Sequence, residues 1–398
     1  MKQGFVKVAS ATPKIRVADP VYNARAICTQ AKEAAEHGAK IIVFPELCIT
    51  GYTCNDLFLQ NLLLMKAKEA LLTIAEETSR LEALLFVGLP VEKDGRLYNV
   101  AAAVYRGSIL GMIPKKNIPT YAEFYEGRYF TPGEERITNL RLGEYEIPFG
   151  TNLLFCCEEL PELVLGCEIC EDLWVADPPS TSHTLAGATV IANLSASNET
   201  VSKDAYRELL IKSASARLLC GYIYTSAGEG ESTQDLVFGG HNLIAENGTL
   251  LAQSSRFATG ILYTDLDVLK ISSERRRMGT FGKQPTASYY QIPFSMELTE
   301  TKLERKFAAH PFVPEDPALR NRRCEDILSI QVYGLKKRYE HIGGKTAVLG
   351  ISGGLDSTLA LLVTVRTFDL LGLARKGIIA VTMPCFGTTD RTYENACL

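Results

Sequence analysis

Residues 5 to 267 alternate between short apolar segments and longer segments in which apolar residues recur every three or four positions. This alternation restricts the possible folds more than any other feature of the chain. The short segments predict strands, and the longer segments predict helices. The expected helices are 21–37, 57–81 and 205–219, and the expected strands are 4–11, 40–44, 83–89, 100–105, 163–167, 189–193, 221–225 and 240–244.

Two dipeptides that are typical of β-hairpins lie between short apolar segments. These are Asp94-Gly95 and Asn247-Gly248, and such pairs favour the tight turn of an antiparallel hairpin. Helical crossovers connect other strands, which indicates parallel pairing there. A chain with both kinds of connection has an α/β or α+β fold, so we expect a layered sandwich of sheets and helices.

A chain of 398 residues is longer than one ordinary hydrophobic core, so we expect two domains. Residues 268–320 interrupt the alternation with polar segments and repeated prolines, as in a connection that crosses the surface. The prolines are Pro285, Pro293, Pro311, Pro314 and Pro317. A charged helix is expected from Ala318 toward Tyr339. The expected organisation is therefore a first domain at 1–267, a linker at 268–320 and a second domain at 321–398.

Composition and charge exclude several classes of protein. With 46% hydrophobic and 22% charged residues the chain is typical of a globular protein, and no apolar run is long enough to span a membrane. A net charge of -4 predicts no nucleic-acid partner. The 11 cysteines are irregularly spaced and the N-terminus resembles no signal peptide, which favours reduced thiols in the cytoplasm. The run Arg275–Arg277 predicts a solvated patch or an interdomain contact.

A glycine-rich turn in the second domain predicts a site for phosphate groups. Apolar residues 345–349 predict a strand before the turn, and residues 359–373 predict a helix after it. At such a junction, unpaired backbone N–H groups and the helix dipole favour phosphate oxygens. The turn offers close backbone approach at its glycines, hydroxyl donors at its serines, and a carboxylate that can hold a Mg²⁺ bridging the phosphates. The expected nucleotide-binding residues are Gly350, Ser352, Gly353, Gly354, Asp356 (the Mg²⁺ ligand) and Ser357.

The residues of this turn also permit other interpretations. Gly350, Ser352 and Gly354 match the nucleophile elbow of α/β-hydrolases, but that fold places its His after the Ser, whereas the last His here is His341. A Walker A loop would end in Gly-Lys-Ser/Thr, which is absent, and a turn that only starts a helix stays possible. The segment Ser352–Ser357 instead resembles the SGGxDS signature of ATP pyrophosphatases, which split ATP into a transferred AMP and pyrophosphate.

In the first domain, Glu46, Lys115 and Cys170 each follow an apolar segment that predicts a strand. Catalytic groups are commonly carried where strands end. A free thiol is only a few per cent ionised at neutral pH, so Cys170 would need help to act as a nucleophile. Glu46 can accept the thiol proton, and Lys115 can stabilise a developing oxyanion.

Each of these three residues also has an ordinary interpretation. Glu46 and Lys115 could be solvated surface residues. Cys167 and Cys170 could form a redox or zinc pair. Zinc would need a second spaced pair, and the nearest cysteines, at 156 and 157, are adjacent.

Four segments favour the catalytic interpretation over the ordinary one. They resemble, in the same order along the chain, the motifs of the nitrilase (carbon–nitrogen hydrolase) superfamily. These segments are Phe44–Tyr52, Pro114–Tyr121, Glu126–Gly133 and Cys170–Trp174. The resemblance implies a four-layer αββα sandwich. It also implies a Glu-Lys-Cys triad at Glu46, Lys115 and Cys170, supported by a second glutamate at Glu126.

Together with the SGGxDS signature, further segments resemble the glutamine-dependent NAD(+) synthetase family. They are Cys170–Val175, Pro178–Ser180, Asn193–Asn198 and, near the end, Met383–Thr389. Many relatives carry Arg where this chain has Lys203. By position, the resemblance implies a glutamine pocket formed by Tyr52, Tyr121, Phe124, Glu171, Ser197 and Lys203.

The resemblance implies a reaction with two sites. Cys170 attacks the amide of L-glutamine and releases ammonia, with no cofactor in this half, and ammonia passes through a channel. In a Rossmann-like parallel α/β domain, Mg-ATP adenylates deamido-NAD, and ammonia displaces AMP to give NAD⁺. The family's second domain is longer than residues 321–398, so we expect the chain to stop inside it. Homo-oligomers are also implied. The alternatives are a stand-alone amidase with a tail and a non-catalytic regulatory subunit.

Overall fold

The computed structural model describes residues 1–143, 145–233, 235–282, 288–387 and 389–398. Pro285, in the expected linker, and Thr388, in the segment 383–389, lie outside the described residues. The chain forms two compact units, Met1–Lys306 and Phe307–Leu398. Among the described residues, no helix is long and apolar enough to cross a membrane.

The first sheet of unit 1 has eight strands among the described residues, in the order β14-β1-β2-β3-β4-β5-β7-β6. Neighbours β1, β2 and β3 run parallel, and β3, β4 and β5 form an antiparallel meander. The strands are β1 (Phe5–Thr12), β2 (Ile41–Val43), β3 (Leu84–Lys93), β4 (Arg96–Tyr105), β5 (Ser108–Pro114), β6 (Thr138–Leu142), β7 (Tyr145–Phe149) and β14 (Gly260–Asp267).

The second sheet has seven strands among the described residues, in the order β13-β12-β11-β10-β9-β8-β15. Its centre, β9, β10 and β11, is parallel. The strands are β8 (Leu153–Cys157), β9 (Val164–Ile169), β10 (Val190–Ser195), β11 (Gly221–Ser226), β12 (Leu243–Glu246), β13 (Thr249–Gln253) and β15 (Tyr290–Phe294).

Both predicted hairpin turns are confirmed. Asp94 and Gly95 join β3 to β4, and Asn247 and Gly248 join β12 to β13. All four residues have positive φ, between 46° and 83°. Two successive positive φ angles match the right-handed twist of the paired strands, and Asn, Asp and Gly tolerate them best.

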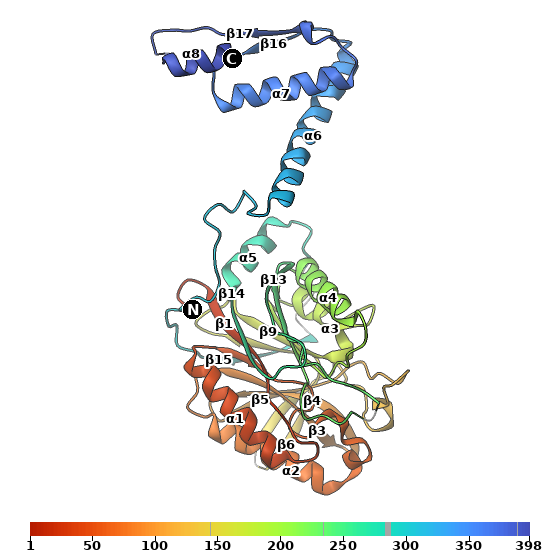
Figure 1. Ribbon diagram of the computed structural model, residues 1–398. Helices are drawn as coiled ribbons and strands as arrows, with labels where there is room; N and C mark the ends of the chain where they lie inside the picture. The colour runs from red at the N-terminus through yellow and green to blue at the C-terminus, as the bar shows by residue number, and fades with distance from the viewer. Residues whose placement is uncertain (144, 234, 283–287, 388) are drawn as a thin grey trace. The chain divides into compact units, whose positions relative to one another are not determined.

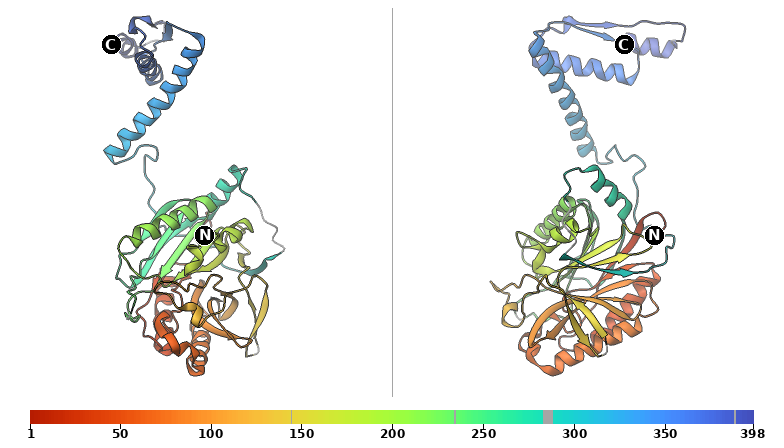
Figure 2. Two further views of the ribbon diagram at one scale, coloured as in Figure 1. Left: turned by 90° about the vertical axis from the view of Figure 1, so that its right-hand side faces the viewer. Right: turned by 180° about the vertical axis from the view of Figure 1, so that it is seen from behind.

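Helices cover the outer face of each sheet, and the two inner faces pack together (Figures 1 and 2). The helices α1 (Pro20–Glu36) and α2 (Asn61–Glu77) lie on the first sheet, and α3 (Pro179–Leu185) and α4 (Lys203–Leu218) lie on the second. Between the sheets, Val8 and Phe86 meet Leu165 and Ile223 in one buried cluster. The layers therefore follow the expected αββα order.

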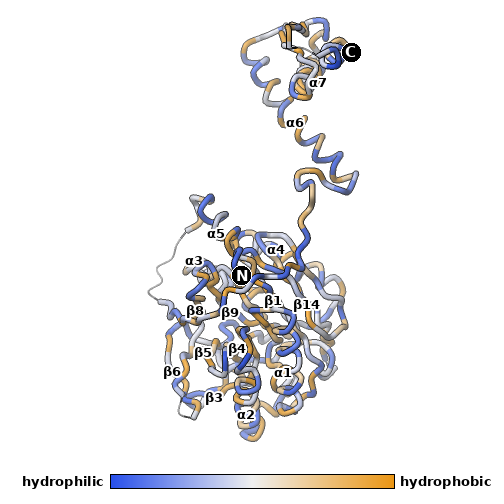
Figure 3. Tube along the Cα trace, turned by 90° about the vertical axis from the view of Figure 1, so that its left-hand side faces the viewer, coloured by the Kyte–Doolittle hydropathy of each residue, from blue (hydrophilic) through white to orange (hydrophobic). Residues whose placement is uncertain are grey.

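The sequence of α1 explains both its start and its packing. The Asp19 side chain accepts a hydrogen bond from the backbone of Tyr22, and Pro20 occupies the first turn, where its missing N–H costs nothing. One face of the helix, including Ile27 and Ala31, is buried on the first sheet, and the hydropathy of the α1 tube accordingly alternates along its length (Figure 3).

The predicted helix 57–81 is wrong at both ends. The structure has a 3-10 segment, η1 (Tyr52–Leu59), and α2 begins only at Asn61 and ends at Glu77. Gln60, between the two elements, has φ -91° and ψ 118°, an extended backbone that interrupts the helix after Leu59. Local periodicity does not reveal such a break.

The segment 268–306 contributes structure to unit 1. It contains α5 (Val268–Arg277) and β15, which is the last strand of its sheet among the described residues, and an edge position tolerates Pro293. The Arg275 guanidinium donates to the backbone carbonyls of Ala188, Leu218 and Leu219 at 2.7–3.2 Å. Arg276 and Arg277 are exposed.

Unit 2 contains the expected charged helix and the expected strand, turn and helix. The helix α6 (Pro317–Ile342) ends at Gly343, whose φ is 64°. It is followed by β16 (Ala347–Gly350), α7 (Leu355–Leu370), β17 (Ile378–Val381) and α8 (Asp390–Cys397). The strands β16 and β17 pair in parallel across the α7 crossover, as in a Rossmann-like sheet.

Candidate active site

Three strand ends carry the predicted triad of unit 1. Glu46 lies just after β2, Lys115 directly follows β5, and Cys170 directly follows β9. Glu46 and Lys115 are fully buried, and Cys170 is 7% exposed. A hydrogen bond connects the two sheets here: the Glu46 N–H donates to the carbonyl of Ser195, at the end of β10, at 3.3 Å. The triad therefore lies where strand ends of the two sheets meet.

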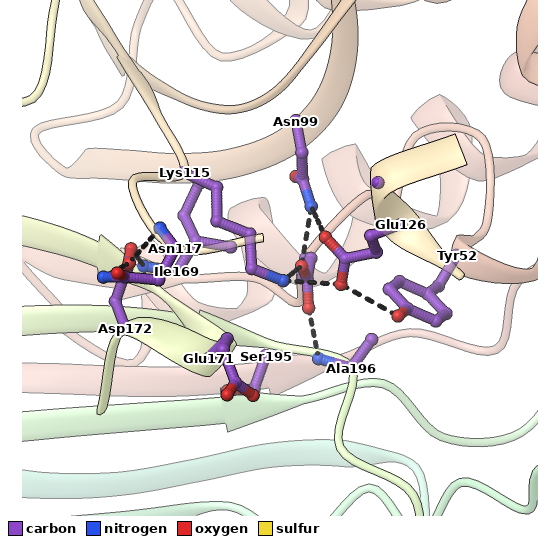
Figure 4. Close-up of polar contacts among 12 residues, drawn as sticks. Tyr52, Asn99, Lys115, Asn117, Glu126, Ile169, Glu171, Asp172, Ser195 and Ala196 are labelled. Atoms are coloured by element: carbon purple, nitrogen blue, oxygen red, sulfur yellow. Dashed lines mark hydrogen bonds and ion pairs between the residues drawn. The ribbon is translucent and has the colours of Figure 1, made fainter. Parts of the chain in front are cut away.

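Lys115 is held between two carboxylates. Its Nζ lies 2.7 Å from Glu46 Oε1 and 2.6 Å from Glu126 Oε1, as the dashed lines around Lys115 show in Figure 4. Burial opposes the lysine charge, but Glu126 and Glu46 outweigh it and raise the pKa of Lys115 well above its usual value. A buried ammonium needs such partners. Lys115 is therefore a fixed cation inside the protein.

Asn99, Ala196 and Tyr52 hold the two carboxylates in place. Asn99 Nδ2 donates to Glu46 Oε1 at 2.6 Å, and the Ala196 backbone donates to Glu46 Oε2 at 2.8 Å. The Tyr52 hydroxyl donates to Glu126 Oε1 at 2.9 Å (Figure 4). Sequence reasoning missed Asn99 and Ala196. The only local signal for Asn99 is a polar residue inside a strongly apolar strand.

Glu126 lies in the 3-10 turn η2 (Glu126–Arg128) and is 4% exposed. Burial raises the pKa of this carboxyl to about 7, with Glu46 adding to the rise and Lys115 opposing it. Glu126 therefore changes charge near neutral pH.

The turn that carries Cys170 is tightly fixed. Cys170 opens the 3-10 segment η3 (Cys170–Leu173) with φ 45°, a left-handed backbone that is uncommon outside glycine. Buried Asp172 accepts the Ile169 N–H at 3.0 Å and two N–H groups of Asn117 at 2.8 Å each. Asp172 thus links the Cys170 turn to the loop after Lys115. Sequence reasoning missed this role.

The Cys170 thiol is protonated at neutral pH. Burial raises its pKa well above the usual value, the charges of Glu46 and Glu126 raise it further, and Lys115 opposes them. A reaction at this sulfur therefore needs a base that removes the proton as the bond forms. Cys167 lies in the core between the sheets, and all 11 cysteines are free. No group of His, Cys, Asp or Glu in the described part of the chain is arranged to hold a metal ion.

Cys170 opens onto a cavity of about 420 Å³. The cavity contains charges of both signs, since its wall includes Glu171, Glu123 and Lys203. Of the six predicted pocket residues, Tyr52 lies behind Glu126, and the other five line the cavity: Tyr121, Phe124, Glu171, Ser197 and Lys203.

Two polar groups on this wall are preorganised. The Tyr121 hydroxyl donates to Glu171 Oε1 at 2.8 Å, and burial raises the pKa of Glu171. Lys203 Nζ lies 5.6 Å from the ring centre of Phe124 and 5.2 Å from that of Trp174. Burial lowers the pKa of Lys203. The aromatic faces favour a cation at this position.

In unit 2, the predicted phosphate loop connects β16 to α7. Gly353 has φ 75°, and a Cβ there would lie 1.9 Å from the Thr392 carbonyl oxygen, so only glycine fits. Ser352 and Ser357 hydroxyls lie 3.2 Å apart, and Gly354 is the N-cap of α7 without a side-chain cap. Asp356 is exposed in the first turn of α7. The first N–H groups of α7 are thus open to an anion.

Comparisons with known proteins follow the same division of the chain. A family model described as carbon-nitrogen hydrolase matches residues 7–276, and one described as NAD synthase matches residues 327–398. The chain is 42% identical over 405 residues to the glutamine-dependent NAD(+) synthetase of Mycobacterium tuberculosis, covering 99% of this chain and 60% of that protein. For the Aquifex aeolicus protein of the same description, identity is 30% over 362 residues, covering 89% and 57%. The chain thus spans about 60% of the length of these curated relatives.

Solved structures agree with the fold. The glutamine-dependent NAD(+) synthetase of Cytophaga hutchinsonii superposes with a TM-score of 0.60 at 21% identity, covering 99% of this chain and 62% of that one. Nit3 of Saccharomyces cerevisiae, a nitrilase superfamily member, gives 0.54 at 18% identity, covering 70% and 95%. Since the family model spans more than half of the chain and the αββα sandwich is present, the chain belongs to the carbon–nitrogen hydrolase family.

Proposed function

We propose that unit 1 hydrolyses the side-chain amide of L-glutamine and that Cys170 is its nucleophile. One observation carries this proposal: a buried Glu-Lys pair meets a cysteine on a strained turn, and the cysteine opens onto a cavity with charges of both signs. The 42% identity to proteins described as glutamine-dependent NAD(+) synthetases supports glutamine as the substrate.

In the proposed mechanism, Glu46 accepts the thiol proton while Cys170 sulfur attacks the amide carbon. Lys115, held by Glu46 and Glu126, stabilises the oxyanion because its charge is already in place. The intermediate collapses to a thioester, and Glu46 returns the proton to the leaving ammonia. Water then attacks the thioester, Glu46 acting again as the base, and releases glutamate and free Cys170.

The charges on the cavity wall suit the zwitterionic end of glutamine. Lys203 is a cation held over two aromatic rings, and we assign it to the α-carboxylate. Glu171, with Tyr121 as its hydrogen-bond donor, is assigned to the α-ammonium. Phe124 and Ser197 complete the wall, and Tyr52 acts through Glu126. A small aliphatic amide, the substrate of a stand-alone amidase, would leave these charges unpaired.

For the whole protein we propose glutamine-dependent synthesis of NAD⁺. Ammonia from unit 1 would amidate deamido-NAD after ATP has activated its carboxylate. The loop residues Gly350, Ser352, Gly353, Gly354 and Ser357 suit the ATP phosphates because they combine backbone N–H groups with hydroxyls. Asp356 suits a Mg²⁺ that is otherwise held by phosphate oxygens and water, as Mg²⁺ commonly is. A homo-oligomer and a cytoplasmic location stay predictions from the resemblance.

The test of the glutaminase is ammonia release by Cys170→Ala. Loss of the nucleophile should lower the rate by several orders of magnitude. Cys167→Ala is the matched control, because that thiol lies in the core, and its activity should stay near wild type. Near-normal hydrolysis by Cys170→Ala, or an equal loss in both variants, would refute the assignment.

The two-site division is tested in the full-length protein by measuring NAD⁺ formation from glutamine and from free ammonia. Cys170→Ala should keep the reaction with ammonia and lose it with glutamine. Asp356→Ala should lose both, because it removes the proposed Mg²⁺ ligand. If Cys170→Ala fails equally with both nitrogen sources, the two sites are not separate.

A further inference from the structure

Arg207 is a fully buried arginine that the proposed mechanism does not use. It lies on α4, one turn after the cavity residue Lys203, and its side chain has no exposed surface. Arginine is among the residues least often buried without partners, because removing its charge from water is costly. The partners of this guanidinium therefore indicate its role.

Arg207 binds each residue of the segment 197–199, which runs from β10 toward α4. Its Nη2 donates to Ser197 Oγ at 3.2 Å and to the Asn198 carbonyl at 3.3 Å, and its Nη1 lies 2.9 Å from Glu199 Oε1. A planar guanidinium fixes several acceptors at once, which a lysine ammonium cannot reproduce. Arg207 thus holds this segment from the side of α4, while the bridge between Asn198 and Phe238 holds its backbone.

His241 completes the shell around Arg207. Nη1 of Arg207 lies 2.8 Å from His241 Nδ1, so this ring nitrogen must be the acceptor. The other ring nitrogen then carries the proton and lies 2.7 Å from Nε2 of the Gln253 amide, whose oxygen accepts this proton once the amide is turned over. Burial lowers the pKa of His241 to about 4, so the ring stays neutral beside the guanidinium.

The segment that Arg207 binds also holds the cavity cation. The side-chain oxygen of Asn198 accepts a hydrogen bond from Lys203 Nζ, and its Nδ2 donates to Glu123 Oε1 at 2.6 Å. Asn198 is 4% exposed, so its orientation follows its backbone. A displacement of the 197–199 backbone would therefore displace Lys203 at the cavity wall.

We propose that Arg207 is a positioning residue for substrate specificity: through Asn198 it places Lys203 to receive the α-carboxylate of the amide substrate. The inference rests on the proposed glutaminase function. It predicts that loss of Arg207 weakens selection of substrates with an α-carboxylate, while the chemistry at Cys170 is spared.

The test compares kcat/KM for ammonia release from glutamine and from 4-aminobutanamide, which is glutamine without its α-carboxylate. For Arg207→Lys we expect the glutamine preference to fall about tenfold, mainly through KM, as for one weakened charge-assisted hydrogen bond. Arg217→Lys is the matched control, because it makes the same change on an exposed position of α4. Its preference should equal that of wild type.

Asn198→Ala provides a second variant that leaves the buried pair of Arg207 and Glu199 intact, should Arg207→Lys fold poorly. It should reduce the preference by a similar factor. When either change is added to Lys203→Met, the preference for glutamine should fall no further, because both changes act through Lys203.

Equal losses with both amides in Asn198→Ala, or a further fall in the double variants, would overturn the inference while leaving the glutaminase assignment intact. A wild-type chain that hydrolyses neither amide would overturn the proposed function itself, and the inference with it.

Discussion

Replacing Glu126 by glutamine removes one negative charge from the buried pair around Lys115 and keeps the side-chain shape. The amide oxygen can still accept hydrogen bonds from Tyr52 and Lys115, which lie 2.9 and 2.6 Å from Glu126 Oε1. The variant therefore isolates the effect of ionising Glu126. That effect should appear as a dependence of stability on pH.

The sign and size follow from the pKa of Glu126, which burial raises from 4.5 to about 7. A carboxyl whose pKa is raised by folding stabilises the folded state most below its unfolded pKa. That contribution is lost as pH rises from about 4.5 through 7. A rise of this size corresponds to about 3 kcal/mol of unfolding free energy. Glu126→Gln should therefore gain about 3 kcal/mol relative to wild type between pH 4.5 and 8.

Urea unfolding at a series of pH values measures this difference. Trp174 is the only tryptophan of the chain and lies at the cavity, so its fluorescence follows unit 1. Glu168, whose pKa burial also raises to about 7, is present in both proteins and cancels. Glutamine hydrolysis by the variant should be lower at pH 8, because Lys115 loses one of its two anions. A constant difference in unfolding free energy across this pH range would refute the reasoning.

Two further substitutions test residues that hold the catalytic segments in position. A Cβ on Gly88 would lie 2.3 Å from the Leu47 backbone nitrogen, so Gly88→Ala should cost about 2 kcal/mol of stability and reduce glutamine hydrolysis. Gly279→Ala, with no atom within 4 Å of the new Cβ, should do neither, and equal thermal melting of the two variants would contradict this. Asp172→Asn should cost about 2 kcal/mol and lower kcat, because the Cys170 turn loses a charged acceptor. The exposed Asp177→Asn is its control, and an unchanged kcat in Asp172→Asn would show that the turn holds its shape without that charge.

Local sequence determined most elements of this fold because their signals act over a few residues. Period-two and period-3.6 patterns predicted the central strands and α1, and Asp94-Gly95 predicted its hairpin through the φ angles that these residues tolerate. The strand, turn and helix around Ser352 followed in the same way. The start of α2 did not, because the extended backbone at Gln60 separates it from the apolar residues before it, and no local signal marks that break.

The candidate triad was also readable from the sequence, since Glu46, Lys115 and Cys170 each follow an apolar segment and catalytic groups are commonly carried where strands end. Their motifs, more than their spacing, separated them from ordinary surface residues. Whether the three side chains lie close together could not be read from the sequence. That depends on how the two sheets pack, and the packing brings the C-terminal ends of β2, β5 and β9 together.

Only the tertiary structure decided which side chains support the site. Asn99 reaches Glu46, Asp172 reaches Asn117, and Arg207 reaches His241, each across a long stretch of chain. Such contacts depend on strand order and register, and no local pattern encodes either. The pKa values have the same origin, because they follow from burial and from charges that only the packed sheets bring within reach. The sequence alone determined the elements and the reactive residues, while the packing of the two sheets decided their environment.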